Sequence, residues 1–89
     1  MSAPHMVPAQ SVLAAHLGDE SVLLDLDTKH YFRLNETAAV IWRALERSPH
    51  ADAIVRRLVE EFDVTEAEAR RALEQLLEDL RRKGLVVAP

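Results

Sequence analysis

The spacing of apolar residues changes from two to about 3.6 within Val22–Trp42, and this change constrains the fold more than any other feature. Apolar residues alternate from Val22 to Leu26, which predicts a strand with Asp25 and Asp27 on its opposite face. A second strand follows, and the helical spacing starts directly after it. A chain with this pattern joins a β-hairpin to a helix with almost no linker.

The second strand of this hairpin, His30–Leu34, follows a tight turn at Asp27–Lys29. We expect it to be the last strand of the sheet and to lie at an edge, where unpaired N–H and C=O groups form a template for an incoming peptide. The residues alone favour the alternative of a solvated edge that Lys29 and Arg33 guard. Its side chains alternate between two faces, Phe32 and Leu34 on one and Tyr31 and Arg33 on the other.

A helix is predicted over about Glu36–Arg47. Asn35 is a suitable N-cap, because its side-chain oxygen can accept a backbone N–H of the first turn. The helix should end before Ser48-Pro49, since a residue that precedes proline is disfavoured in the helical conformation. Four apolar residues recur at helical spacing: Ala38, Ile41, Trp42 and Leu45.

An additional strand, Gln10–Leu17, is predicted before the hairpin, with Leu13, Ala15 and Leu17 on one face. Gly18-Asp19 fits a two-residue hairpin turn, in which glycine supplies a positive φ. Residues 1–9 contain two prolines and no periodic pattern. We therefore expect a flexible tail over residues 1–9 and one folded domain over residues 10–89.

Two more helices are predicted, at about Asp52–Phe62 and Glu66–Lys83. Thr65 and Glu68 match the capping box, in which each side chain accepts the other residue's backbone N–H. Gly84 is a natural residue to end the third helix. The second helix presents one apolar stripe: Ile54, Val55, Leu58, Val59 and Phe62.

The order of these elements predicts the fold class. Three antiparallel strands followed by three helices make an α+β architecture of the winged helix-turn-helix-like type. The short apolar run Leu85–Val87 should then attach the C-terminal segment to the core.

Composition narrows the classes of function. The 89 residues include 15 acids and 11 bases, and the net charge of −4 weighs against a nucleic-acid partner. There is no cysteine, and no apolar run approaches the roughly 20 residues of a membrane helix. We expect a cytoplasmic protein of a single domain that does not bind a membrane.

Residues suited to catalysis are scattered. No two histidines have the i, i+4 spacing of a zinc site, and no serine has a nucleophile-elbow context. With two glycines in the chain, a glycine-rich phosphate loop is also absent. We expect no enzyme activity, no cofactor and no metal. The residues considered are His5, His16, His30, His50, Ser11, Ser21 and Ser48.

The third helix carries more apolar residues than one packing contact requires. A stripe formed by Ala69, Leu73, Leu76 and Leu80 would attach it to the core. Ala72 and Leu77 widen the apolar face beyond this stripe. Two interpretations remain open, a helix buried over a broad face or a groove with Leu77 in its wall.

The run LDLDTKHYFRLNETAAVIW resembles the core signature of the PqqD family, and the similarity continues in the same order over about residues 10–87. These proteins, known as RiPP recognition elements, bind the leader of a ribosomally made precursor peptide and deliver it to modifying enzymes. A free-standing chain of this size most resembles the leader-binding proteins of lasso-peptide pathways. One departure is Lys29, because the family often has glycine in this turn.

The resemblance implies a non-catalytic adaptor whose third strand accepts the leader as a fourth strand, in a groove against the third helix. Its implied partners are the precursor peptide and either a leader protease with a macrocycle-forming enzyme or a radical SAM enzyme. Cations beside the groove would steer an acidic peptide. The expected peptide-binding residues are Lys29, His30, Tyr31, Phe32, Arg33, Leu34, Arg70, Leu73, Glu74, Leu77 and Arg81.

The main alternative is a winged-helix DNA-binding regulator that reads DNA with its third helix. Glu66–Lys83 contains five acids and five bases and begins with two glutamates, whereas recognition helices usually present a basic first half. The charge pattern therefore favours the adaptor. A purely structural subunit of a larger complex is a third option.

Overall fold

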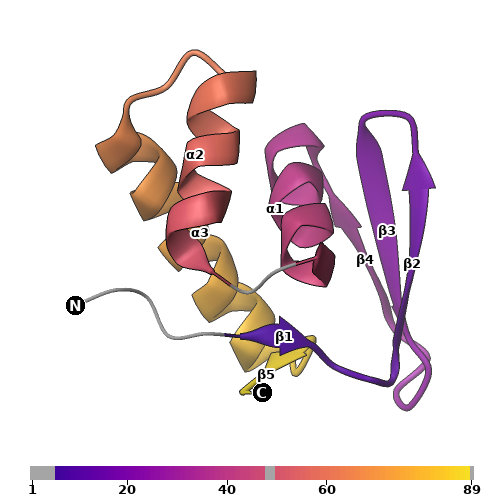
Figure 1. Ribbon diagram of the computed structural model, residues 1–89. Helices are drawn as coiled ribbons and strands as arrows, with labels where there is room; N and C mark the ends of the chain where they lie inside the picture. The colour runs from indigo at the N-terminus through magenta and orange to yellow at the C-terminus, as the bar shows by residue number, and fades with distance from the viewer. Residues whose placement is uncertain (1–5, 48–49, 89) are drawn as a thin grey trace.

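The computed structural model describes residues 6–47 and 50–88, and it confirms the predicted order of strands and helices (Figure 1). The fold is α+β, with a three-stranded antiparallel sheet followed by three helices. The sheet consists of β2 (Val12–Leu17), β3 (Glu20–Asp25) and β4 (Tyr31–Leu34). The helices are α1 (Glu36–Arg47), α2 (Ala51–Glu61) and α3 (Glu66–Arg82).

The strands are arranged in the order β2-β3-β4, so that β4 lies at one edge. A two-residue turn joins β2 to β3, and its first residue, Gly18, has a φ of +64°. Lys29 takes a φ of +65° in the turn before β4, a conformation that costs a side-chain-bearing residue about 1 kcal/mol. The chain therefore builds this turn with a strained lysine.

The buried face of β3 differs from the one that the alternation of Val22, Leu24 and Leu26 suggested. Leu23 is fully buried, and Asp25 lies on the same covered face. Asp25 was expected on a solvated face; its carboxylate instead accepts the backbone N–H of Asp27 at 2.9 Å. The helices cover this face of the sheet, and the alternating apolar residues lie on the other.

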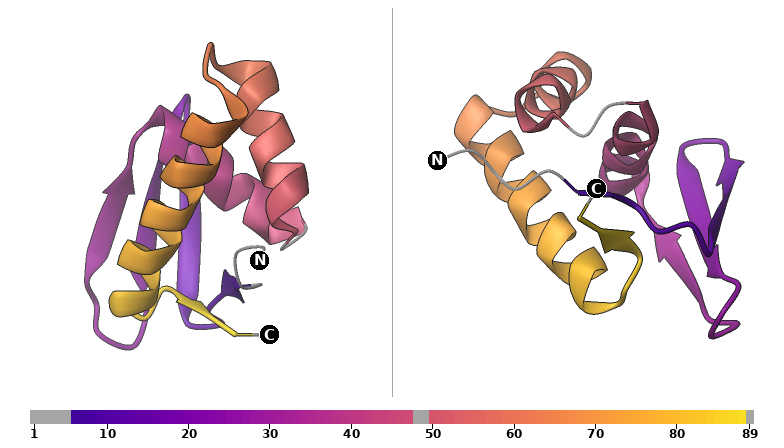
Figure 2. Two further views of the ribbon diagram at one scale, coloured as in Figure 1. Left: turned by 90° about the vertical axis from the view of Figure 1, so that its left-hand side faces the viewer. Right: turned by 60° about the horizontal axis from the view of Figure 1, so that its bottom comes forward.

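Helix α1 packs between the sheet and the pair formed by α2 and α3 (Figures 1 and 2). Its N-cap is confirmed, since Asn35 Oδ1 accepts the Ala38 N–H at 2.9 Å. Ser48 and Pro49, predicted to follow this helix, lie outside the described residues. The largest fully buried side chains of the core include Trp42, Leu23, Ile41, Ile54, Leu58, Leu73 and Leu85.

The capping box predicted for α3 is present. Thr65 Oγ1 accepts the Glu68 N–H at 3.1 Å, and Glu68 Oε1 accepts the Thr65 N–H at 2.9 Å. The helix ends one residue earlier than predicted, with Lys83 as its C-cap and Gly84 at a φ of +75°. These local interactions fix the length of the helix that faces the sheet.

A second, two-stranded sheet was not predicted. β1 (Val7–Pro8) pairs antiparallel with β5 (Val86–Val87), and the side chain of Met6 is buried. Residues 1–5 of the predicted tail lie outside the described part of the chain. Leu85 and Val86 are buried, which confirms that the C-terminal segment is attached to the core.

Candidate functional site

The outer edge of β4 is open. Within residues 6–47 and 50–88, β4 pairs only with β3. The Asp25 N–H donates to the His30 carbonyl at 2.8 Å. Because hydrogen-bonded and non-hydrogen-bonded pairs alternate along an antiparallel ladder, this bond shows which residues of β4 bond to β3. Phe32 and Leu34 therefore direct their backbone groups toward β3, while the N–H and C=O groups of Tyr31 and Arg33 point to the open side.

A groove lies between α1 and α3, and Asn35, the residue that follows β4, forms part of its wall. It has a volume of about 270 Å³. Ala72 and Leu76 of α3 face Ala38 and Ile41 of α1 across an apolar floor, and the small alanines leave room there. We call this feature the α1–α3 groove; its lining residues are Asn35, Thr37, Ala38, Ile41, Ala72, Gln75, Leu76 and Asp79.

The C-terminal end of α3 reaches β4. The ammonium group of Lys83 lies 5.7 Å from the centre of the Phe32 ring, and Phe32 is half-buried against the core. Ala72, Leu76, Asp79 and Lys83 follow one another at helical spacing and so share one face of α3. The last of them, Lys83, contacts β4.

Charges at the end of the α1–α3 groove are paired within α3. Asp79 accepts hydrogen bonds from Arg82 at 2.8 Å and from Gln75 at 3.2 Å. On another face of α3, the hydrogen bond from Arg81 lowers the pKa of Glu78, and the same bond raises the pKa of Arg81. The floor of the groove is apolar, and its polar side chains lie at the rim.

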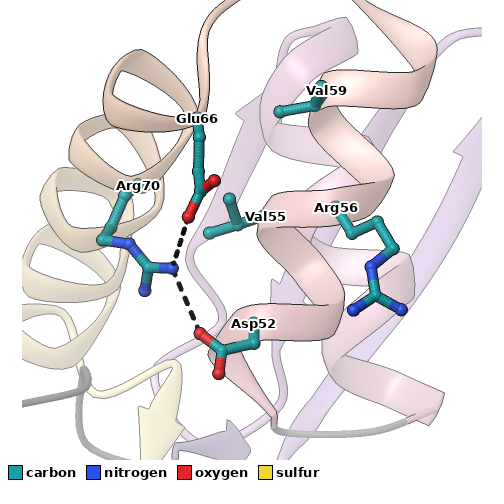
Figure 3. Close-up of a pocket in the computed structure, with 6 residues that line it drawn as sticks. All are labelled: Asp52, Val55, Arg56, Val59, Glu66 and Arg70. Carbon is teal, nitrogen blue, oxygen red and sulfur yellow. Dashed lines mark hydrogen bonds and ion pairs between the residues drawn. The ribbon is translucent and has the colours of Figure 1, made fainter.

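Arg70, predicted beside the third strand, instead lies between α2 and α3 (Figure 3). Its guanidinium bridges Asp52 at 3.1 Å and Glu66 at 3.5 Å. The hydrogen bond to Asp52 is the main reason that the pKa of Arg70 is raised. These three residues line a pocket between α2 and α3 that has a volume of about 370 Å³. Val55, Arg56 and Val59 also line this α2–α3 pocket.

The other predicted helix residues also lie away from the α1–α3 groove. Leu73 and Leu77 are 0% and 7% exposed and belong to the core, while Glu74 and Arg81 are exposed on other faces. Leu76, assigned from the sequence to the core stripe, is the leucine that lines the groove. Helix α2 packs on the flank that carries Arg70 and Leu77, which leaves the Ala72–Leu76 flank toward β4.

The predicted strand residues are where the sequence placed them. Tyr31 and Arg33 point to the outer face of the sheet, and Phe32 and Leu34 point toward the helices. Lys29 and His30 are exposed in the turn before the strand. The structure thus brings the strand residues together at one edge. Ala72, which the sequence placed on the widened apolar face, and Leu76 line the nearby groove, and Lys83 is a contact of β4 that the sequence did not single out.

One trio of side chains has the order of a hydrolase triad. His16 Nδ1 lies 2.7 Å from Ser21 Oγ, and His16 Nε2 lies 3.6 Å from Glu46 Oε1. Ser21 is fully buried under the helices, so no substrate can reach its hydroxyl. The described residues contain no cluster of three potential metal ligands and no helix able to cross a membrane.

Comparison with known protein families shows to which family this chain belongs. The family model for coenzyme PQQ synthesis protein D (PqqD) matches residues 20–86, which is most of the chain. The chain belongs to the PqqD family. The matched residues of this PqqD-family protein include the β4 edge and both walls of the α1–α3 groove.

Two solved structures share the fold of this PqqD-family protein over nearly its whole length. TbiB1 in complex with the TbiA(beta) leader peptide is 34% identical, with a TM-score of 0.85 over 90% of this chain and 93% of that one. A lasso peptide synthetase B1 complexed with the leader peptide is 25% identical, with a TM-score of 0.84 over 93% and 98% of the two chains. None of the curated protein sequences matches.

Proposed function

We propose that this protein is a non-catalytic adaptor that binds the leader segment of a ribosomally synthesised precursor peptide. The leader adds to β4 as a fourth strand and places alternate side chains in the α1–α3 groove. The observation that carries the proposal is the open β4 edge beside an apolar groove of about 270 Å³. Both similar structures are complexes with leader peptides, which supports the same ligand class here.

Strand addition suits a ligand that is disordered before binding. The ladder to Tyr31 and Arg33 supplies affinity without regard to sequence, and the groove selects side chains at every second position. Micromolar binding requires about 8 kcal/mol of net free energy, after the cost of ordering the peptide. A few apolar side chains buried against Leu76 and Ala38, together with the ladder, are of the right order to supply it.

The bound leader is then presented to the enzymes that process the precursor. We assign these partners as a leader protease and a macrocycle-forming enzyme, by analogy with lasso-peptide pathways, with a radical SAM enzyme as the counterpart in a pathway closer to PqqD itself. The site of action is the cytoplasm, where ribosomal precursors are made. Binding and presentation require no reactive group on this chain.

A matched pair of aspartate substitutions tests the proposal. A fluorescent leader peptide is titrated with the wild type, Leu76→Asp and Val59→Asp. Leu76 lines the α1–α3 groove, whereas Val59 is a partly exposed apolar residue in the separate α2–α3 pocket. We expect Leu76→Asp to weaken binding at least tenfold and Val59→Asp to leave it unchanged, with circular dichroism confirming both folds.

Unchanged binding by Leu76→Asp would contradict the proposed groove. The same titration with duplex DNA serves as a control for the regulator alternative, and at moderate salt we expect no binding. Tight binding of DNA together with no binding of the leader would overturn the adaptor function.

A further inference from the structure

The alternation at the β4 edge determines which leader residues face which side. Residues directly opposite each other in neighbouring strands share one face of the sheet. Because Tyr31 and Arg33 carry the free backbone groups and point outward, the leader residues opposite them also point outward. The leader residues that enter the α1–α3 groove are those between and beside the two that lie opposite Tyr31 and Arg33. The outward positions are therefore read by the outer face of the sheet.

That outer face carries few charges. Across the three strands it consists of Leu13, Ala15, Leu17, Glu20, Val22, Leu24, Tyr31 and Arg33. The one base in this set, Arg33, stands in the edge strand itself, and the one acid, Glu20, is a strand farther away. An added strand therefore meets the positive charge first.

Arg33 retains unused donors. Its side chain is 75% exposed, and Nη2 donates to Glu20 Oε1 at 2.9 Å. Within residues 6–47 and 50–88, this nitrogen is the one guanidinium atom of Arg33 with a hydrogen-bond partner. Arginine has five N–H donors in a planar fork, so the remaining donors can bind a second carboxylate while the bond to Glu20 persists.

We propose that Arg33 is a specificity-determining residue that selects a carboxylate side chain on the leader residue opposite it. This inference rests on the proposed strand addition to β4. A lysine at the same leader position would be repelled by the guanidinium and is disfavoured. The outward leader residue two positions away lies opposite Tyr31, whose exposed ring offers an apolar contact instead. The leader is thus read on both faces, by apolar packing in the groove and by charge outside it.

The expected discrimination is modest because the pair is exposed. Cross-strand ion pairs of this kind favour the opposite charge by about two- to fivefold in affinity. Reversing the charge of Arg33 should therefore reverse the preference. Neutralising it with Arg33→Gln should abolish the preference and retain the side-chain length.

The test uses a displayed library of random ten-residue peptides, selected separately on the wild type, Arg33→Glu, Arg33→Gln and Arg56→Glu. Arg56 is an exposed arginine of α2 that points away from Arg70 in Figure 3, and it serves as the matched control. We expect the wild type and Arg56→Glu to enrich an acidic residue at one fixed distance from the apolar positions. Arg33→Glu should enrich a basic residue there, and Arg33→Gln neither.

Selected peptides are then compared as pairs that differ only by glutamate or lysine at that position. The same glutamate-to-lysine affinity ratio for the wild type, Arg33→Glu and Arg33→Gln would overturn the role of Arg33. If those peptides still require Leu76, the adaptor function stands without it. Selection of no peptide on any of the four proteins would instead contradict the proposed function itself.

Discussion

Lys83 lies over the ring of Phe32, with 5.7 Å between its ammonium nitrogen and the ring centre. The contact joins the C-cap of α3 to the middle of β4, two elements that are far apart in the sequence. It therefore links the end of the helix to the open strand.

This contact should contribute measurably to stability. A cation over an exposed aromatic ring is worth about 0.5–1 kcal/mol, so Lys83→Met should lower the free energy of unfolding by that amount. Urea unfolding followed by circular dichroism measures the change. Lys83→Arg keeps the charge and should retain most of the stability. Equal losses in both variants would mean that the charge over the ring contributes nothing.

Hydrogen exchange should distinguish the two sets of β4 amides. In the free protein the Phe32 and Leu34 amides bond to β3 and should exchange slowly, whereas those of Tyr31 and Arg33 should exchange fast. Addition of the leader peptide should protect Tyr31 and Arg33 selectively. Protection at β2 instead, measured by nuclear magnetic resonance, would place the peptide on the opposite edge of the sheet.

The neighbouring leucines of α3 should differ in their effect on stability. Leu77 is buried in the core, so Leu77→Ala should cost about 2–4 kcal/mol. Leu76 faces the α1–α3 groove, and Leu76→Ala should cost about 1 kcal/mol because less of its surface is buried by the fold. Chemical denaturation of both variants measures the difference. The reverse order would return Leu77 to the groove and Leu76 to the core.

Acid should weaken the start of α3. The backbone N–H of Thr65 is the main cause that lowers the pKa of Glu68, so the native state holds the ionised carboxylate. Its stabilisation is present above the pKa of unfolded glutamate, about 4.3, and is lost as the pH falls through the lower folded value. Stability measured from pH 6 to pH 3 should depend less on pH in Glu68→Gln. Thr65→Ala should cost about 1 kcal/mol at neutral pH.

Removal of the first eight residues should destabilise the fold. The truncation deletes β1 and the buried side chain of Met6, whose burial alone is worth about 1.5–3 kcal/mol. Thermal unfolding of a chain that starts at Ala9 should show a lower midpoint. Removal of residues 1–5 alone leaves Met6 and β1 in place and serves as the control.

Local rules in the sequence predicted the elements well. The change of spacing after Leu34, the Asn35 cap and the Thr65–Glu68 box each involve residues within four positions of one another. They yielded the observed bounds of α1 and the observed start of α3. Gly18 was likewise identified correctly as a position of positive φ, and Gly84 as the residue at which the third helix ends.

Local sequence rules could not predict which residues are buried by packing between distant elements. Leu76 and Leu77 lie on opposite flanks of one apolar arc, and only the position of α2 decides which of them is buried. The same holds for Leu23, which is covered because α1 lies over that face of β3. The pairing of β1 with β5 involves two residues on each side, which is too short for a periodic pattern.

The unoccupied border of β4 also has a consequence for handling the protein. Exposed backbone donors and acceptors along a strand can recruit another polypeptide indiscriminately, and natural sheets usually guard such positions. A bound leader would cover these backbone groups, so the peptide would protect the protein that binds it from such association. We therefore expect the protein to stay soluble to higher concentrations when it is co-produced with its peptide than when it is produced alone.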